Sequence, residues 1–313
     1  MRRLLLRLLA GFGVLCTLLL ALFAATIPAI HRWGASDAEL SLRLPGDELL
    51  ADPQVRWTHA TTIDASPTAV WPWVAQLGDE RGGFYSFTFI ENRVGSLTGA
   101  AEYQAVYRNA NQIVPAWQGP KPGDALIQGV LNVRAVQPGA LLLADSVDPE
   151  TFGWSWLWYL APLDGGARTR LIVRLAIQLP AASQSQVAGS VMDLGGFVME
   201  QRMIHGLKLR AEGWREPAWS EAAEIGLWVT ALLCGLLAAG LFVVCQRWQR
   251  PLGIAVAAVV VIFVLTFAQP PLFVRLGLDV MLAVGVWSVA RRVALGARRS
   301  LRGSLATPTT GLK

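Results

Sequence analysis

The chain has 313 residues, of which 53% are hydrophobic and only 16% are charged. A soluble domain typically has about 25% charged residues, so this composition argues against a wholly soluble enzyme and against a disordered chain. The net charge of +5 is unevenly distributed: residues 31–224 hold 15 basic and 21 acidic residues, whereas the rest holds 12 basic residues and one acidic residue. The mildly acidic middle of the chain argues against nucleic-acid binding, and no nucleic-acid partner is expected.

The first predicted element is an apolar run from Leu8 to Ile30, which follows an arginine-rich N-terminus. A run of about 20 residues matches the roughly 30 Å hydrocarbon core of a bilayer. A cleaved signal peptide is the alternative, because the small residues Ala24 and Ala25 lie near the end of the run. Since the apolar part of a signal peptide usually has only about 7–15 residues, residues 1–30 are predicted to be an uncleaved membrane anchor.

Residues 31–220 are numerous enough to form one domain with its own core. Residues 56–64 are rich in β-branched and aromatic side chains and are predicted to form a strand. A serine followed by a proline then predicts a helix over residues 66–78. A second short helix is predicted over residues 85–94.

Several short strands are expected next, because turn signals such as Gly123-Asp124 interrupt the chain. The clearest strand covers residues 152–160, where large apolar residues at every second position must share one face of a sheet. These residues are Phe152, Trp154, Trp156, Trp158 and Leu160. Residues 168–178 alternate in the same way and are the predicted partner strand. In that strand Arg174 is expected to face solvent. A long helix is predicted over residues 183–212.

Two segments resemble a known family. Residues 65–95 (ASPTAVWPWVAQLGDERGGFYSFTFIENRVG) are similar to the N-terminal signature of bacterial SRPBCC (START-like, helix-grip) proteins, and residues 197–212 (FVMEQRMIHGLKLRAE) resemble their C-terminal helix. The resemblance covers residues 55–214. It implies an α+β helix-grip fold, in which a curved antiparallel sheet surrounds a long C-terminal helix and a ligand cavity lies between them. The superfamily holds lipid carriers and polyketide cyclase/dehydrase-like enzymes, and fold transfers between such relatives better than activity does.

The ligand-binding candidates are large side chains and two charged ones that could line such a cavity. Aromatic residues supply much of the contact area in small-molecule pockets, and methionine adapts to irregular partners. Ordinary core packing is the alternative for any one of them. The candidates are Trp71, Trp73, Arg81, Phe84, Tyr85, Phe87, Glu91, Trp154, Trp156, Met199 and Met203.

No catalytic residue is assigned. Tyr85, Glu91 and His59 are weak candidates for proton transfer, because each could act as an acid or a base if it reached the cavity. The sequence has no phosphate-binding loop, dinucleotide fingerprint, zinc-protease motif or nucleophile elbow. We therefore expect no cofactor, no metal site, and no familiar hydrolytic or nucleotide-dependent catalysis.

Three further apolar runs predict that residues 221–291 form three transmembrane helices. The runs are residues 225–245, 252–268 and 272–290. The last run contains Arg275 and Asp279, which are four residues apart and are expected to pair on one helix face near the interface. A small-residue pattern in the first of these runs (Ala231, Gly235 and Ala239) permits close contact with a partner helix.

The positions of the arginines predict the topology. They are concentrated at the N-terminus, between the second and third spans, and in the basic tail of residues 292–313. With four spans, these three segments fall on one side of the membrane, which the positive-inside rule makes cytoplasmic. Both termini are therefore predicted to be cytoplasmic, and the domain of residues 31–220 to lie outside the cytoplasm.

The leading hypothesis is a membrane-tethered START-like domain that binds a hydrophobic small molecule or lipid. Two alternatives remain open: a cyclase/dehydrase-like enzyme that uses the same cavity, and a membrane interaction module with no ligand. Catalysis is the less favoured reading, because no recognisable catalytic motif supports it.

Overall fold

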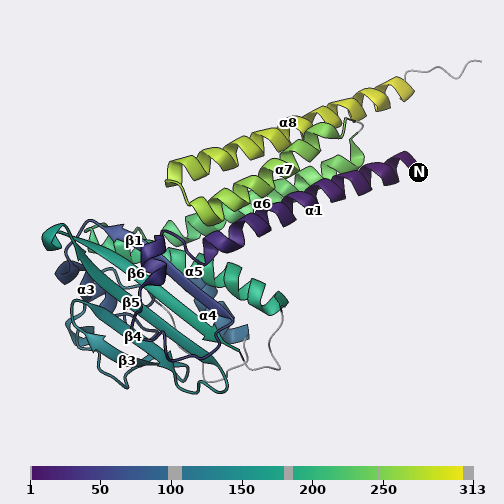
Figure 1. Ribbon diagram of the computed structural model, residues 1–313. Coiled ribbons are helices and arrows are strands. Elements are labelled where there is room, and N and C mark those ends of the chain that lie inside the picture. The colour runs from purple at the N-terminus through teal and green to yellow at the C-terminus, as the bar shows by residue number, and fades with distance from the viewer. Residues whose placement is uncertain (1, 98–107, 180–185, 246, 306–313) are drawn as a thin grey trace, which may run out of the picture. The chain divides into compact units, whose positions relative to one another are not determined.

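The computed structural model describes residues 2–97, 108–179, 186–245 and 247–305. The chain divides into two compact units, Ala25–Ala218 and Met1–Ala24 together with the chain from Trp219 onward. The first unit combines helices with a β-sheet, and the second consists of long helices (Figure 1). The molecule is therefore an α+β domain joined to a helical part.

A six-stranded antiparallel sheet forms the centre of the α+β unit, with the strand order β1-β6-β5-β4-β3-β2. Sequence periodicity locates the long strands well: β6 has the predicted ends, and β1 and β5 overlap their predicted ranges. The strands are β1 Val55–Ile63, β2 Ala125–Ile127, β3 Leu131–Gln137, β4 Leu141–Ser146, β5 Gly153–Leu163 and β6 Arg168–Gln178.

Helices α3 (Pro67–Ala75) and α5 (Gln186–Ala211) pack against one face of the sheet, and α4 (Thr88–Leu97) follows α3 in the chain. Ser66 caps α3 as predicted, because its hydroxyl accepts a hydrogen bond from the backbone N–H of Ala69 at 3.3 Å. The second short helix begins three residues later than predicted. Tyr85, where the prediction starts it, has a left-handed backbone with φ of 56°, which a right-handed helix cannot contain. Residues 183–185 of the predicted long helix lie outside the described residues.

The main core lies on the face that these helices cover. The strand register aligns Trp57, Leu175, Trp156 and Ala144 in one row across the sheet, and all four are buried. The side chain of Met203, on α5, is buried in the same cluster. The predicted alternation along β5 is confirmed, because its even-numbered aromatic residues all belong to this core or pack against it.

The opposite face of the sheet is also covered, which the sequence did not predict. The apolar residues that flank helix α2 (Asp37–Ser41) pack on this face against β4, β5 and β6, and Glu39 joins α2 itself to β6 through Arg170. The expectation that Arg174 faces solvent is therefore wrong. Its guanidinium is buried, forms an ion pair with Asp47 at 2.8 Å and donates a hydrogen bond to the Leu42 carbonyl at 2.7 Å.

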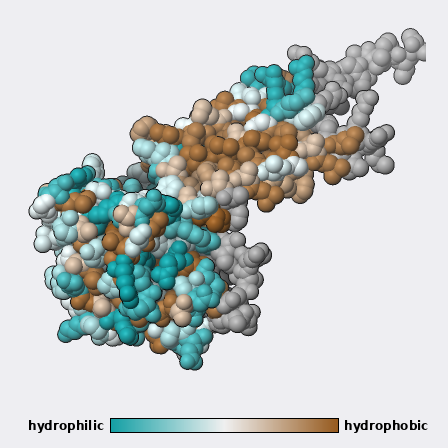
Figure 2. Space-filling model, viewed as in Figure 1, coloured by the Kyte–Doolittle hydropathy of each residue, from teal (hydrophilic) through white to brown (hydrophobic). Residues whose placement is uncertain are grey.

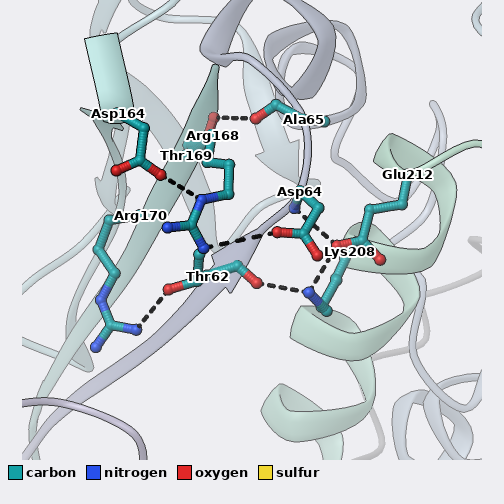
Figure 3. Close-up of polar contacts among 9 residues, drawn as sticks. All are labelled: Thr62, Asp64, Ala65, Asp164, Arg168, Thr169, Arg170, Lys208 and Glu212. Carbon is teal, nitrogen blue, oxygen red and sulfur yellow. Dashed lines mark hydrogen bonds and ion pairs between the residues drawn. The ribbon is translucent and has the colours of Figure 1, made fainter. Parts of the chain in front are cut away.

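Polar contacts fasten the C-terminal part of α5 to the end of β1 (Figure 3). Lys208 on α5 donates a hydrogen bond to the Thr62 carbonyl at 2.5 Å and pairs with Glu212 at 2.6 Å. Glu212 also accepts a hydrogen bond from the Asp64 backbone N–H at 2.8 Å. These bonds fix the position of α5 along the sheet at this end.

The residues that follow helix α1 (Arg2–Ile30) are hydrogen-bonded to the outer edge of β1. The N–H groups of Thr58 and Ala60 donate to the carbonyls of His31 and Trp33 at 2.9 and 3.0 Å. Gly34 has φ of 70°, and a Cβ there would lie 2.1 Å from the Ala60 carbonyl oxygen. Only glycine fits so close to the strand. This connection is therefore part of the folded domain.

Within the described parts of the chain, four helices are long and apolar enough to cross a membrane, as predicted. The apolar segments are Leu8–Ile30, Ser220–Val244, Gln249–Ala268 and Leu272–Leu295. They belong to α1, α6 (Ser220–Val244), α7 (Gln249–Phe263) with the π-helical turn η4 (Val264–Ala268), and α8 (Leu272–Leu305). Figure 2 shows the corresponding apolar surface in brown.

The predicted pair between Arg275 and Asp279 does not form. Arg275 instead lies 3.4 Å from Glu224 at the start of α6, and Asp279 is only 3% exposed. Neither carboxylate oxygen of Asp279 has a hydrogen-bond partner among the described residues. Helical spacing within one segment cannot reveal a competing partner such as Glu224 on another helix. In the small-residue pattern, a Cβ at Gly235 would lie 3.2 Å from Ala258, so this glycine faces α7 of the same chain.

Candidate functional site

A row of three tryptophans lies on the helix-facing side of β5. The ring centroids of Trp154 and Trp156 are 5.3 Å apart, and those of Trp156 and Trp158 are 4.4 Å apart. Phe84, from the connection between α3 and α4, stacks on Trp156 at 5.5 Å with an interplanar angle of 21°. The alternation of β5 creates this row, because residues two apart on a strand point to the same side.

The indole N–H groups of this row are unusual. The Nε1 atoms of Trp154, Trp156 and Trp158 are all buried, and none has a hydrogen-bond acceptor among the described residues. Trp57, two strands away, shows the ordinary arrangement: its Nε1 donates to Asp193 at 3.1 Å. A buried indole N–H usually finds a partner, and each one left without a partner costs about 1–3 kcal/mol. Three such donors side by side are suited to a molecule that carries acceptor atoms.

A second polar group lies between β1 and α5. The ring of His59 is fully buried, and its Nδ1 lies 2.6 Å from Glu200 Oε1 on α5. The other ring nitrogen contacts the carbonyl of Ile30, the last residue of α1. Asp193, two turns before Glu200 on α5, accepts from Trp57 and lies 3.0 Å from His31 Nε2. These contacts tie α5 and the end of α1 to β1.

His59 is a candidate from the sequence, but neither its partner Glu200 nor Asp193, which binds Trp57 and His31, was predicted. Asp193 and Glu200 are seven residues apart, so both fall on the same helix face as Phe197, which is fully buried. Carboxylates on the buried stripe of a helix are the signal that could have revealed the pairing.

Tyr85 is held by its surroundings. Its hydroxyl donates to the Trp73 carbonyl at 3.0 Å and accepts from Gln76 Nε2 at 3.0 Å. Burial raises the pKa of the Tyr85 phenol above its usual value. The guanidinium of Arg210 lies 4.7 Å from the centre of its ring. With its hydroxyl occupied and a raised pKa, Tyr85 is poorly suited to proton transfer near neutral pH.

The structure brings most of the predicted ligand-binding residues to one side of the sheet. Phe84, Tyr85, Trp156 and Met203 share one core cluster, and three further candidates pack against it. These three are Trp71, Trp73 and Trp154.

The remaining candidates lie as follows. Arg81 donates hydrogen bonds to the carbonyls of Ala75, at the end of α3, and Trp117. Phe87 is buried beneath the guanidinium of Arg202. The carbonyl of Met199 accepts a hydrogen bond from the Ser86 hydroxyl at 2.7 Å. Glu91 is partly buried in the first turn of α4.

Comparison with known proteins gives little further information. No family model matches the chain, and no curated protein does. Among solved structures, a protein from Mesorhizobium loti is 16% identical, with a TM-score of 0.24, and the match covers 49% of this chain and 95% of that one. A protein from Deinococcus radiodurans is 14% identical with a TM-score of 0.24, covering 49% and 99% of the two chains. A Thermus thermophilus protein is 14% identical with a TM-score of 0.22, covering 50% and 96%. At these values the likenesses carry no argument about function.

Proposed function

We propose that this protein is a membrane-tethered START-like domain of the SRPBCC, helix-grip type, which binds a hydrophobic small molecule or lipid between the sheet and α5. The observation that carries the proposal is the row of three tryptophans whose buried N–H groups have no acceptor among the described residues. The indole faces suit an apolar ligand body, and the N–H groups suit its oxygen atoms.

The apolar helices support a lipid or lipid-like ligand. A domain held by transmembrane helices samples the bilayer surface at a high effective concentration, so it can exchange apolar molecules with the membrane. The arginines beside the helices favour a domain outside the cytoplasm, with both termini inside. In this proposal the anchor supplies access to the ligand and the tryptophan row supplies its binding site.

Two measurements on the full chain, purified in mild detergent, test the proposal. They are native mass spectrometry and solvent extraction of any bound molecule. We expect a defined apolar ligand to co-purify. Replacing Trp156 or Trp158 by phenylalanine keeps an aromatic ring but removes one N–H donor. Each replacement should weaken ligand binding by about two- to tenfold, the range for one hydrogen bond.

Trp214→Phe is the matched control, because Trp214 is 67% exposed and lies outside the core clusters. Its ligand occupancy should equal that of the unaltered protein. Thermal unfolding of every variant separates loss of the ligand from loss of the fold. A folded protein that carries no ligand and takes up none from mixed lipid vesicles would refute the proposal.

A further inference from the structure

A cavity of about 370 Å³ lies in the α+β unit on the side of the sheet opposite the tryptophan row. It is formed where the end of α1 meets β1, β6 and the segment around α2. Its lining includes the apolar residues Pro28, Leu40 and Leu42 and the basic residues Arg32, Arg56 and Arg174. The cavity therefore combines an apolar wall with cationic groups.

The base of the cavity is preformed. Arg174 is buried, and its guanidinium is fixed by Asp47 at 2.8 Å, by Thr58 Oγ1 at 3.1 Å and by the Glu39 carbonyl at 2.8 Å. Asp47 also pairs with Arg56 at 3.1 Å, so two guanidiniums share one carboxylate. This sharing leaves an excess of positive charge at the cavity.

The other carboxylates near the cavity are engaged or screened, and Asp193, which lies 3.0 Å from His31 Nε2, also accepts a hydrogen bond from Trp57. Arg32 pairs with Asp37, whose side chain is 88% exposed and whose charge is therefore well screened by water. Glu39 is engaged by Arg170, outside the cavity lining, at 2.6 Å. The side chains of Arg32 and Arg56 are both partly exposed, so each has surface available to an incoming anion.

Two residues that line the cavity directly follow the first apolar segment, which links the cavity to the membrane surface. His31 and Arg32 line the cavity and follow directly after the apolar segment Leu8–Ile30. The last turns of α1, from Ala25, belong to the α+β unit. If the preceding part of α1 crosses the bilayer, Arg32 lies eight residues beyond it, about 12 Å along a helix, and so near the lipid headgroups.

We propose that this cavity binds the phosphate of an anionic phospholipid headgroup, with the apolar wall against the first carbons of the lipid. Arginine suits phosphate because its planar guanidinium can donate two parallel hydrogen bonds. A choline headgroup would place an ammonium group among the arginines and should be disfavoured. The inference rests on the proposed membrane anchoring, but it concerns the face of the sheet opposite the tryptophan row.

Lipid titration of the delipidated full chain in detergent, followed by native mass spectrometry, tests the assignment. Phosphatidylglycerol should bind more tightly than phosphatidylcholine. Arg32→Gln and Arg56→Gln should each weaken phosphatidylglycerol binding by about tenfold, the effect of losing one charged hydrogen bond. Arg56→Lys keeps the positive charge but lacks the paired donors. Its affinity for phosphatidylglycerol should lie between those of the unaltered protein and Arg56→Gln.

Arg134→Gln is the matched control, because Arg134 also pairs with an aspartate, Asp145 at 3.5 Å, but lies outside the cavity. It should bind phosphatidylglycerol normally. The proposal would be overturned if Arg134→Gln and Arg56→Gln lost phosphatidylglycerol binding equally, or if no variant lost it. Inorganic phosphate that binds as tightly as the lipid would instead assign the cavity to a free anion.

Trp156→Phe separates this inference from the proposed function. It should leave phosphatidylglycerol binding unchanged, because the tryptophan row lies on the other face of the sheet. Loss of lipid binding in Trp156→Phe, with none in Arg32→Gln or Arg56→Gln, would place the bound phospholipid in the tryptophan site and overturn the inference.

Discussion

Glu39 connects helix α2 to the sheet through a single carboxylate. It closes a capping box with Ser36, whose N–H donates to Glu39 Oε2 at 2.7 Å, and it pairs with Arg170 of β6 at 2.6 Å. The hydrogen bond from Arg170 lowers the pKa of Glu39 from 4.5 to about 2. Glu39 therefore holds α2, and the segment around it, against the far face of the sheet.

This contact predicts a specific pH dependence. Because the pKa of Glu39 is lower in the folded than in the unfolded chain, its stabilisation is complete above pH 4.5 and is lost as the pH falls towards 2. Glu39→Gln should lower the free energy of unfolding at neutral pH by about 1 kcal/mol. It should also flatten the decline in stability between these pH values. Thermal unfolding across the pH range measures both effects.

Glu48→Gln provides the comparison, because Glu48 is an exposed carboxylate of the same segment. Its pH profile should follow that of the unaltered protein. A Glu39→Gln profile as steep as the unaltered one would show that other carboxylates account for the acid sensitivity.

Among the elements, α5 depends on a close approach to β1. A Cβ at Gly196 would lie 2.2 Å from the ring of Trp57, whereas one at the adjacent Gly195 would meet nothing within 4 Å. Two neighbouring glycines of one helix therefore differ in what surrounds them. The close approach of Trp57 on β1 is enough to require glycine at position 196, and no bound ligand is needed to explain it.

The pair predicts opposite effects of the same substitution. Gly195→Ala should stabilise the protein by up to about 1 kcal/mol through helix propensity. Gly196→Ala should destabilise it by about 1–3 kcal/mol, because Trp57 must move in a packed core. Thermal unfolding of the full chain in detergent compares the two variants. Equal effects would mean that α5 does not lie against Trp57 as described.

The elements also show what the sequence could and could not predict. Period-two alternation located β5 and β6, because burial on one face imposes a regular pattern. The apolar helices were located by uninterrupted apolar runs long enough to cross a bilayer. The covering of the far face by the segment around α2 was missed, since so short a segment shows no periodicity. The burial of Arg174 was missed because alternation along a strand shows which face a residue occupies but not what covers that face.

The candidate site was predictable to a similar degree. Aromatic type and spacing identified Trp154, Trp156 and Phe84, and the structure places them in contact. The pairing of His59 with Glu200 depends on how α5 lies across β1, a contact between residues 141 positions apart. No local pattern determines such a contact.

At the scale of the whole molecule, sidedness is the prediction to test. The native cysteines lie in the apolar helices α1 and α6 or at the end of α6, so they can be replaced by alanine to give a background without thiols. Lys121→Cys then places one thiol on the α+β unit, and Arg247→Cys places one between α6 and α7. Both positions are exposed.

A membrane-impermeant maleimide reagent should label Lys121→Cys in intact cells and Arg247→Cys only after the membrane is opened. The reason is the arginine distribution, which favours a cytoplasmic loop between α6 and α7. The reverse pattern would place the α+β unit in the cytoplasm. Labelling of both thiols in intact cells would rule out the four-span topology.

The hydrogen bonds that join His31 and Trp33 to β1 also affect how neighbouring copies of the protein can meet. An edge strand exposes N–H and C=O groups that can pair with a strand of another chain, and confinement to a membrane raises the chance of such encounters. His31 and Trp33 already occupy two N–H groups on the outer edge of β1. At the opposite edge, β2 has only three residues. Both margins are thereby poor templates for aggregation, and crowded copies can remain separate.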